Sequence, residues 1–255
     1  MWYGLKNKEI ETLEAIDESF MRQLFDAHSK TAKESFYLES GKVPIRFVIK
    51  SRRLMYWWHL VNLSEEKMLS KFYNAQRNMP VKDDWTIQVD KDKEELNLDL
   101  NDNDVKGMSK YAFKKIIKEK IKEAALKYLN QLKGNHSKMN DIQSLELKCS
   151  EYITNSDISS EHSKLLFKFR TRMYSVKTNF RSKFENDLLC DLCASSECNQ
   201  RHLFVCPVLK AFIPELFNTP AKYEDIFGDT DQMKKIVVLL EKICNIREQL
   251  LEDIK

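Results

Sequence analysis

The amino-acid sequence predicts a mainly α-helical protein with one small metal-binding knuckle near its C-terminus. Apolar residues recur every three or four positions over long stretches, which is typical of amphipathic helices. Only 5 Gly and 5 Pro occur in 255 residues, too few for the frequent tight turns of a β-sandwich or β-barrel. The third observation is the pair Cys190-Asp-Leu-Cys193, followed by His202-Leu-Phe-Val-Cys206. We therefore expect one or more helical bundles and a small C-terminal Cys-Cys-His-Cys knuckle.

Six long helices are expected from the apolar pattern and from residues that favour helix starts. Pro44 suits the first turn of a helix, and the hydroxyl of Ser64 suits an N-cap. The expected helices cover 8–24, Pro44 to Leu60, Ser64 to about 78–80, 109–133, Ser159 or Ser160 onward, and 232–252. In the first of them the apolar stripe consists of Ile10, Leu13, Ile16, Phe20 and Leu24. The dense apolar run from Leu54 to Trp58 is expected to lie in the core.

Charge divides the chain into four expected regions. Nine acidic residues but only two lysines lie between Asp83 and Asp104, whereas 109–133 holds eight lysines against two glutamates and 161–183 holds seven Lys and Arg against one glutamate. The regions are a helical region at 1–80, an acidic linker region at 81–108, a basic helical region at 109–187, and a knuckle with a C-terminal helix at 188–255. The net charge of the whole chain is only +3, so its distribution is more informative than its sum.

Several classes of protein are excluded. The chain has no Gly-x-Gly-x-x-Gly run and no Gly-x4-Gly-Lys run, which excludes Rossmann and P-loop nucleotide binding. The uncharged stretch from Leu54 to Leu63 is about ten residues, far short of the roughly 20 that span a bilayer. No secretory signal is evident at the start, so we expect an intracellular protein with no membrane partner. In a reducing compartment, six cysteines are free thiols or metal ligands rather than disulfides.

The cysteine and histidine residues have the spacing of a zinc site. Two cysteines separated by two residues present both thiolates from one tight turn, and a His and a Cys four residues apart share one face of a helix. The expected ligands are Cys190, Cys193, His202 and Cys206. Because four protein ligands leave no open position for water, the expected Zn²⁺ is structural. Cys198 is an alternative ligand in place of Cys190 or Cys193, and incidental buried thiols or a thioredoxin-like redox pair are the other interpretations.

The two basic stretches predict contact with RNA or DNA. Lysine and arginine neutralise phosphates, and neighbouring aromatic rings stack on bases. The expected phosphate-binding residues are Lys114, Lys115, Lys118, Lys122, Lys168, Arg170, Arg172, Lys177, Arg181 and Lys183. The aromatic candidates for stacking are Phe167, Tyr174 and Phe180. The alternative is two solvated helix faces, but the second stretch leads directly into the knuckle, which favours RNA or single-strand contact.

Several further runs of residues share their order and spacing with one protein family. They are Trp2-Tyr3-Gly4-Leu5, Ala27-His28-Ser29-Lys30-Thr31-Ala32-Lys33-Glu34, Tyr37-Leu38-Glu39, Pro44-Ile45-Arg46, Ser51-Arg52-Arg53-Leu54 and Phe167-Lys168-Phe169-Arg170-Thr171-Arg172-Met173, followed by the knuckle. Up to about Cys206 the chain resembles the C-terminal region, after the palm, of reverse transcriptases of non-LTR retrotransposons. The resemblance implies thumb-like helices in 1–80 that grip template and primer, a knuckle that binds RNA or target DNA, and a location in the nucleus. It also implies nucleic-acid contacts for Arg46, Lys50, Arg52 and Arg53.

The chain departs from this family at the catalytic centre. That centre needs an aromatic-x-Asp-Asp turn and a further Asp to hold two Mg²⁺ ions. The pair Asp83-Asp84 follows Val81-Lys82 without the context of a hydrophobic strand, and no endonuclease domain precedes it. We therefore expect no enzyme activity, but a non-catalytic, nucleic-acid-binding remnant of such an element. The alternatives are a helical interaction scaffold that self-associates through 232–252, and an accessory part of an RNA-directed DNA polymerase whose palm is on another chain.

Overall fold

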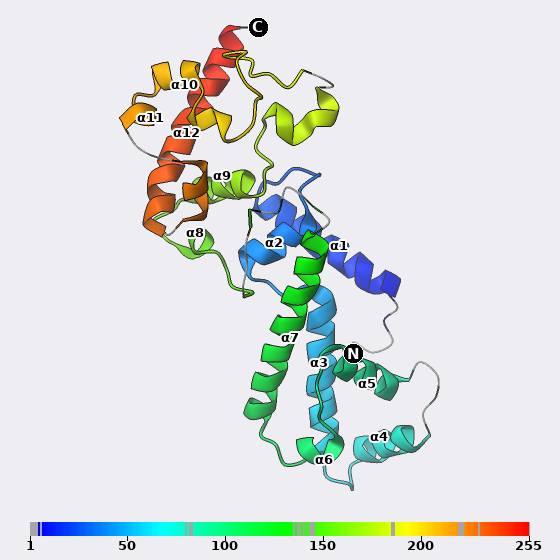
Figure 1. Cartoon of the computed structure of the whole chain (residues 1–255). Helices are drawn as coiled ribbons and strands as arrows, with labels where there is room; N and C mark the ends of the chain where they lie inside the picture. Colours follow the sequence, from blue (N-terminus) through cyan, green and yellow to red (C-terminus); the bar gives the residue numbers. More distant parts are fainter. Residues whose placement is uncertain are drawn as a thin grey trace. The chain divides into compact units, whose positions relative to one another are not determined.

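The structure is a computed structural model of the chain, and it confirms the mainly α fold class (Figure 1). It describes residues 5, 7–79, 81, 84–134, 136, 139, 141–142, 146–184, 187–218, 222–228 and 230–254. These residues form twelve α-helices and no β-strand, and the one β-type pairing among them is an isolated bridge between Leu189 and Glu197. The run Trp2-Tyr3-Gly4 of the family resemblance, Asp83 and Pro80 lie outside the described residues.

The helices are named in chain order. They are α1 (Asn7–Leu24), α2 (Lys33–Ser40), α3 (Ile45–Val61), α4 (Met68–Asn78), α5 (Trp85–Glu95), α6 (Asp102–Val105), α7 (Lys110–Lys133), α8 (Glu151–Thr154), α9 (Ser160–Arg170), α10 (Pro207–Phe212), α11 (Glu215–Asn218) and α12 (Thr230–Asp253). The described residues also include the 3-10 segments η2 (Lys177–Lys183), η3 (His202–Phe204) and η4 (Tyr223–Phe227). Within the described residues, every helix is either too short or too polar to span a membrane.

All six expected helices are present, but one of them begins later than expected. Helix α4 starts at Met68, its N-cap position is Lys67, and no side chain caps it. Ser64 instead closes the preceding turn, in which its carbonyl oxygen accepts a hydrogen bond from the Lys67 amide at 3.0 Å. A serine hydroxyl followed by acidic residues favours a helix start, but the same residue also suits a turn, and the sequence alone does not distinguish the two.

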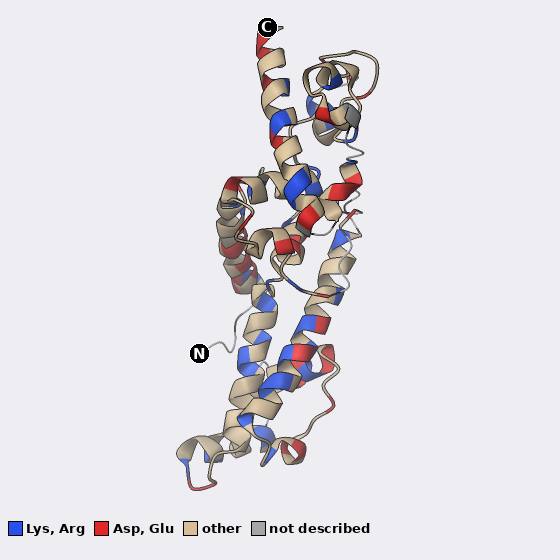
Figure 2. Cartoon of the chain, turned by 90° about the vertical axis from the view of Figure 1, so that its left-hand side faces the viewer, with Lys and Arg blue, Asp and Glu red and all other residues tan. Residues whose placement is uncertain are grey.

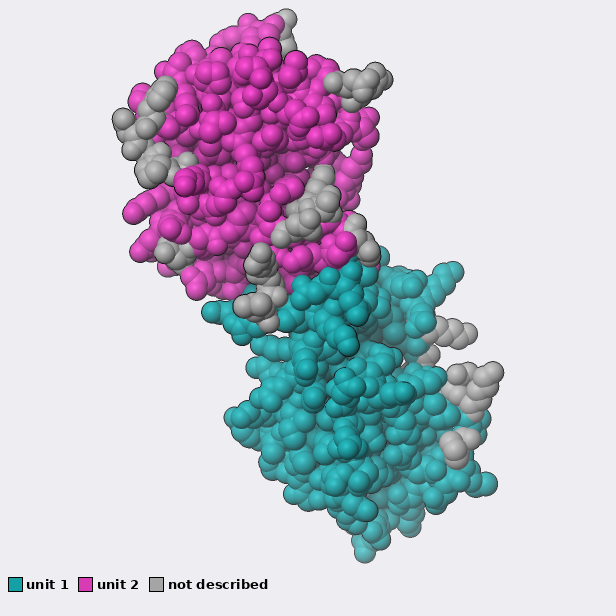
Figure 3. Space-filling view, viewed as in Figure 1, with its two compact units in different colours: residues 1–20, 41–132, 144–148 teal, residues 21–40, 133–143, 149–255 magenta. Residues whose placement is uncertain are grey.

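The chain forms two compact units that are not consecutive in sequence (Figure 3). Unit 1 contains residues 1–20, 41–132 and 144–148, and unit 2 contains residues 21–40, 133–143 and 149–255. The expected boundaries after residues 80, 108 and 187 therefore differ from the two units in the structure. The reason is long-range packing, which the local charge pattern does not report. One example is that α2 packs in unit 2, where Glu39 binds residues more than a hundred positions further along the chain.

Helix α3 is the centre of unit 1. The side chains of Leu54 and Trp57 are fully buried, and the ring of Trp57 packs edge to face against Phe113 of α7, with 5.8 Å between the ring centroids. The apolar stripe of α7 continues with Ile117 and Ile121, which are also buried. The basic helix α7 therefore packs one apolar face on α3 and leaves its other faces in solvent.

The region expected to be an acidic linker at 81–108 is a packed part of unit 1. Its residues form α5 and α6, and Trp85, Val89, Leu96 and Val105 are buried. Two of its acidic side chains accept hydrogen bonds from backbone amides at the N-terminal ends of these helices. The Asp84 carboxylate accepts a hydrogen bond from the Trp85 amide at 2.5 Å, and the Asp104 carboxylate accepts one from the Asn101 amide at 2.8 Å. Clustered acidic residues thus mark helix starts here, in agreement with the dipole of the helix.

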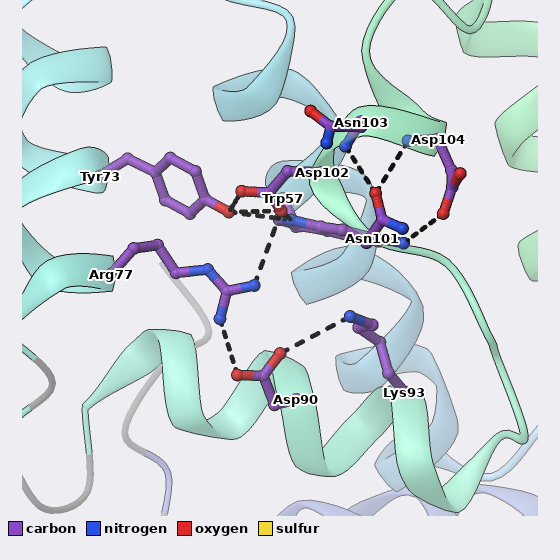
Figure 4. A network of polar contacts seen from close by, with 9 residues as sticks. All are labelled: Trp57, Tyr73, Arg77, Asp90, Lys93, Asn101, Asp102, Asn103 and Asp104. Carbon is purple, nitrogen blue, oxygen red and sulfur yellow. Dashed lines mark hydrogen bonds and ion pairs between the residues drawn. The ribbon is translucent and has the colours of Figure 1, made fainter.

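A polar network holds these helices against α3 (Figure 4). The indole N–H of Trp57 donates to Oδ1 of Asp102 at 2.9 Å, and the hydroxyl of Tyr73 donates to Oδ2 of Asp102 at 2.7 Å. Arg77 bridges Asp102 and Asp90, at 3.6 Å and 2.7 Å. Burial and the neighbouring Asp102 carboxylate raise the pKa of Tyr73, so its hydroxyl remains a donor. One carboxylate therefore joins α3, α4 and α6.

Unit 2 is built around α9 and α12. Leu166 and Phe167 of α9 and Leu240 and Ile243 of α12 are fully buried in one apolar cluster. The stripe expected for 232–252 is therefore largely buried within its own unit.

The apolar stripe expected for the first helix is not its buried face. Ile16, Phe20 and Leu24 are exposed by 64%, 58% and 53%, whereas Met21, which is not in the stripe, is buried. The three-to-four periodicity predicted the helix correctly. Which face is buried depends on the elements that pack against it, and a single helix does not encode this.

Candidate functional site

The four predicted metal ligands converge in unit 2. The sulfur atoms of the three cysteines and one ring nitrogen of the histidine all lie within 4.8 Å of one another, and the group consists of Cys190, Cys193, His202 and Cys206. Cys193 Sγ lies 3.2 Å from Nε2 of His202. Cys190, His202 and Cys206 are buried, and Cys193 is half-buried. These residues are thus positioned to hold a metal ion.

Backbone hydrogen bonds position the first two ligands in a tight turn. The Cys190 amide donates to the Ser196 carbonyl at 2.9 Å, and the Ala194 amide donates back to the Cys190 carbonyl at 2.8 Å. Ala194 has a φ of 51°, in the left-handed region that non-glycine residues seldom adopt. The Cys198 amide closes the loop on the Leu188 carbonyl at 2.7 Å. This turn places the Cys190 and Cys193 thiols on one side of the loop.

The second pair of ligands comes from a short helical turn. The side-chain oxygen of Asn199 accepts a hydrogen bond from the His202 amide at 2.8 Å, and the segment η3 begins at that histidine. The Cys206 amide then donates to the His202 carbonyl at 2.7 Å, an i to i−4 hydrogen bond of the helical type. Pro207 follows at the start of α10. One turn of backbone therefore brings two residues four positions apart to the same side.

The donor set fits a borderline-soft divalent ion in a tetrahedral site. Three thiol sulfurs and one imidazole nitrogen make a Cys₃His set, in which Zn²⁺ is the common occupant. Burial raises the pKa of Cys190 to about 12 and also raises the pKa of Cys206. Burial acts in the same direction on Cys193, but hydrogen bonds with Ser195, the backbone and His202 outweigh it and lower its pKa to about 6. A bound cation favours the thiolate form of all three.

Cys198 does not belong to the cluster, although its position in the loop made it an alternative ligand. Its side chain is buried, and its sulfur lies 4.0 Å from a guanidinium nitrogen of Arg247 on α12. The set chosen from spacing alone is therefore the set that converges.

Most of the basic residues predicted to contact nucleic acid form ion pairs within the chain. The pairs are Arg46 with Glu14 (2.6 Å), Lys50 with Asp92 (3.6 Å), Arg53 with Asp92 (3.4 Å), Lys168 with Asp26 (2.5 Å), Arg170 with Glu39 (3.0 Å), Arg172 with Asp141 (2.8 Å), Lys177 with Asp187 (2.9 Å) and Asp191 (2.6 Å), and Arg181 with Glu197 (3.2 Å). Lys183 lies over the ring of Phe180. A cation that already has a carboxylate partner attracts phosphate less strongly.

The other predicted basic residues have no such partner. Arg52, Lys114, Lys115, Lys118 and Lys122 are exposed, and none forms an ion pair with a carboxylate among the described residues. All of them belong to α3 or α7 of unit 1, where Figure 2 shows lysine and arginine along both long helices. The structure thus distinguishes cations that have a carboxylate partner from those that have none among the described residues, which we call free cations. The sequence does not show this distinction.

Except for Lys115, these free cations line a groove of about 790 Å³ formed largely by α3 and α7. Its basic lining includes Arg52, Lys110, Lys114, Lys118 and Lys122, and its apolar and aromatic lining includes Met55, Tyr56, Trp58, Trp85 and Ile121. Lys110 was missed by the sequence analysis, although its position four residues before Lys114 is a sufficient signal. We call this feature the basic groove.

The structure reverses the expected roles of several aromatic residues: rings expected in the core line the groove, and rings expected to stack on bases are buried. The run Leu54 to Trp58 is core only at Leu54 and Trp57, because Met55, Tyr56 and Trp58 are half-buried and line the basic groove. The three rings expected to stack on bases are buried in unit 2 and unavailable for stacking: Phe167, Tyr174 and Phe180 are 0%, 7% and 9% exposed. A helical stripe does not reveal which of its rings face a groove.

Comparisons with family models, with curated proteins and with solved structures gave no match to this chain.

Proposed function

We propose that this chain is a non-catalytic nucleic-acid-binding protein in which a structural Zn²⁺ stabilises unit 2 and the basic groove of unit 1 contacts phosphates. The observation that carries the proposal is the row of exposed lysines on α7, opposite Arg52 of α3, without carboxylate partners among the described residues. Releasing the counterions of a nucleic acid requires cations that are not already neutralised within the protein.

The zinc ion has a structural role in this proposal. Cys190, Cys193, His202 and Cys206 supply four protein ligands, the number that a tetrahedral structural Zn²⁺ takes, so no position would remain for water or substrate. Such an ion holds the loop at 190–198 against the turn at 202–206, and the buried Leu203 and Leu209 continue into the apolar cluster of unit 2. The proposed contribution of zinc is therefore to the stability of unit 2, not to a reaction.

We also propose that the chain derives from the thumb and knuckle region of a non-LTR retrotransposon reverse transcriptase and acts in the nucleus. The resemblance in sequence and the knuckle support this origin. The absence of polymerase activity is supported by the place of Asp84, which caps α5 rather than ending a strand. The interaction scaffold is not proposed, because Ile236, Leu240 and Ile243 of α12 are buried within unit 2 and do not present a free stripe.

The test is the salt dependence of binding to a fluorescent 20-nucleotide strand, measured by anisotropy between 50 and 300 mM salt. We expect affinity to fall steeply, and the double variant Lys114→Gln/Lys118→Gln to reduce the slope of log K against log salt by roughly 1.5. The matched control is Lys67→Gln/Lys71→Gln, which removes the same charge from exposed lysines outside the groove. A flat salt dependence, or an equal loss in both variants, contradicts the proposal.

A further inference from the structure

We infer that the basic groove binds a single strand, with unpaired bases on its aromatic floor and phosphates along the lysine row of α7. This inference rests on the proposed function and adds the form of the nucleic acid. The proposed function depends on the free cations, whereas the inference depends on the apolar surface between them. Both parts of the groove lie within unit 1.

The floor of the groove offers flat apolar surfaces. Tyr56 and Trp58 of α3 are half-buried, so part of each ring is open to the groove, and His59 beside them is exposed. Base–aromatic stacking uses such a surface and tolerates any sequence, since every base has a π-face. The groove therefore recognises what a nucleic acid exposes when its bases are unpaired.

A duplex makes poor use of this floor. Its bases are stacked and paired inside, and it presents phosphates and groove edges to a protein. Contact with a duplex involves only the cations at the rim of the groove, so the open faces of Tyr56 and Trp58 have no base to stack on. A single strand satisfies both parts of the groove, because its phosphates and its bases are accessible together.

The lysine row has dimensions that suit a short strand. Lys110, Lys114, Lys118 and Lys122 follow one another at intervals of four residues, so the row is about 18 Å long, with about 6 Å between neighbours. A row of this length accommodates on the order of four nucleotides, the lower end of known single-strand sites. Arg52 supplies a cation from α3.

The aromatic rings are held in place before any ligand binds. The indole N–H of Trp58 donates to the Met108 carbonyl at 2.8 Å, and the ring of Tyr56 packs edge to face against Trp85, with 5.5 Å between the ring centroids. A ring that is already oriented loses little conformational entropy on binding. The groove is thus preorganised for stacking.

The first experiment compares affinities at one salt concentration for 20-nucleotide oligo(U), 20-nucleotide oligo(dT) and a 20-base-pair DNA duplex. Charge alone favours the duplex, because its charge density is higher. We expect both single strands to bind at least tenfold more tightly than the duplex. Equal or tighter binding of the duplex overturns the inference, while the salt dependence of that binding still supports the proposed function. If none of the three binds, the proposed function itself fails.

The second experiment uses Trp58→Ala and Trp58→Phe. We expect Trp58→Ala to weaken single-strand binding by roughly tenfold and to leave duplex binding unchanged, whereas Trp58→Phe retains most of the affinity because it keeps an aromatic face. His59→Ala tests the same surface at an exposed position, and we expect it to weaken single-strand binding while the unfolding temperature stays close to that of the unmodified chain. Photocrosslinking of a 4-thiouridine oligonucleotide to the unmodified chain gives a readout independent of any variant. Crosslinks confined to residues outside the groove overturn the inference.

Discussion

The thiol of Cys193 lies 3.2 Å from Nε2 of His202, which joins a loop to a short helical turn in unit 2. Cys190 and Cys206 complete the same cluster. Nothing else in the described part of the chain brings together three or more residues able to hold a metal ion. The cluster therefore distinguishes the two units, since only unit 2 has, among the described residues, a group placed to hold a metal ion.

The first prediction concerns metal content. The purified chain should contain about one zinc per molecule by elemental analysis, and Cys206→Ser should lose it. Cys149→Ser is the matched control, because Cys149 is a half-buried thiol outside the cluster. Since the described tryptophans Trp57, Trp58 and Trp85 all lie in unit 1, chelation should lower the unfolding temperature by circular dichroism more than by tryptophan fluorescence. Zinc-free protein with unchanged unfolding contradicts this prediction.

The second prediction concerns the buried pair of Arg170 and Glu39. Glu39 is fully buried, and its two carboxylate oxygens share the Nε–H of Arg170 in a bifurcated hydrogen bond, at 3.0 Å and 3.1 Å. The carboxylate also accepts a hydrogen bond from the Ser150 hydroxyl at 2.7 Å. Arg170→Met leaves this carboxylate buried without its cation, so we expect a loss of about 3–5 kcal/mol in the free energy of unfolding in urea. Arg181→Met breaks an exposed pair with Glu197 and should cost at most about 1 kcal/mol. Similar losses in the two variants would show that burial does not decide the effect.

The third prediction is a pH dependence in unit 1. Burial raises the pKa of Asp92 to about 6, even though Arg53 and Lys50 act in the opposite direction. An aspartate in the unfolded chain has a pKa of about 3.9. The folded state therefore holds this proton more tightly, and the ionised form costs stability that is regained as the pH falls from above 6 towards 4.

Asp92→Asn removes the titration of this side chain, so the variant serves as the reference for the unmodified chain at each pH. The difference in unfolding free energy between the unmodified chain and Asp92→Asn should shift by about 2 kcal/mol in favour of the unmodified chain between pH 7 and pH 4. Tryptophan fluorescence in urea measures it, because the described tryptophans lie in unit 1. A shift of the opposite sign would mean that the ion pairs with Arg53 and Lys50 outweigh burial.

The sequence was sufficient for features that depend on residues close together in the chain. The knuckle was predictable because its ligands occupy two local turns, at 190–193 and 202–206. The long helices were predictable because each repeats one pattern over many residues. Glycine scarcity likewise excluded the folds that need frequent turns.

Features that depend on distant partners were not predictable in the same way. Arg170 was expected on a phosphate-binding face, but it pairs with Glu39, 131 residues earlier. No local pattern reports such a partner, so charge counts treated paired and free cations alike. The acidic stretch before α7 shows the same limit, because its composition indicated a linker whereas Trp85 and Val89 are buried.

The last prediction separates two arginines to which the family resemblance gave the same role. Arg46 makes two hydrogen bonds to the Glu14 carboxylate, at 2.7 Å and 2.6 Å, and lies over the ring of Tyr128. Arg52 is exposed, lines the basic groove and forms no ion pair among the described residues.

Arg52→Gln should weaken single-strand binding by about fivefold at 0.1 M salt, the contribution of one phosphate contact. Arg46→Gln should leave the affinity nearly unchanged and lower the unfolding free energy by about 1 kcal/mol. Because the two variants remove the same charge from the same helix, a general effect of net charge would reduce both affinities equally, and that result would exclude the basic groove as the binding surface.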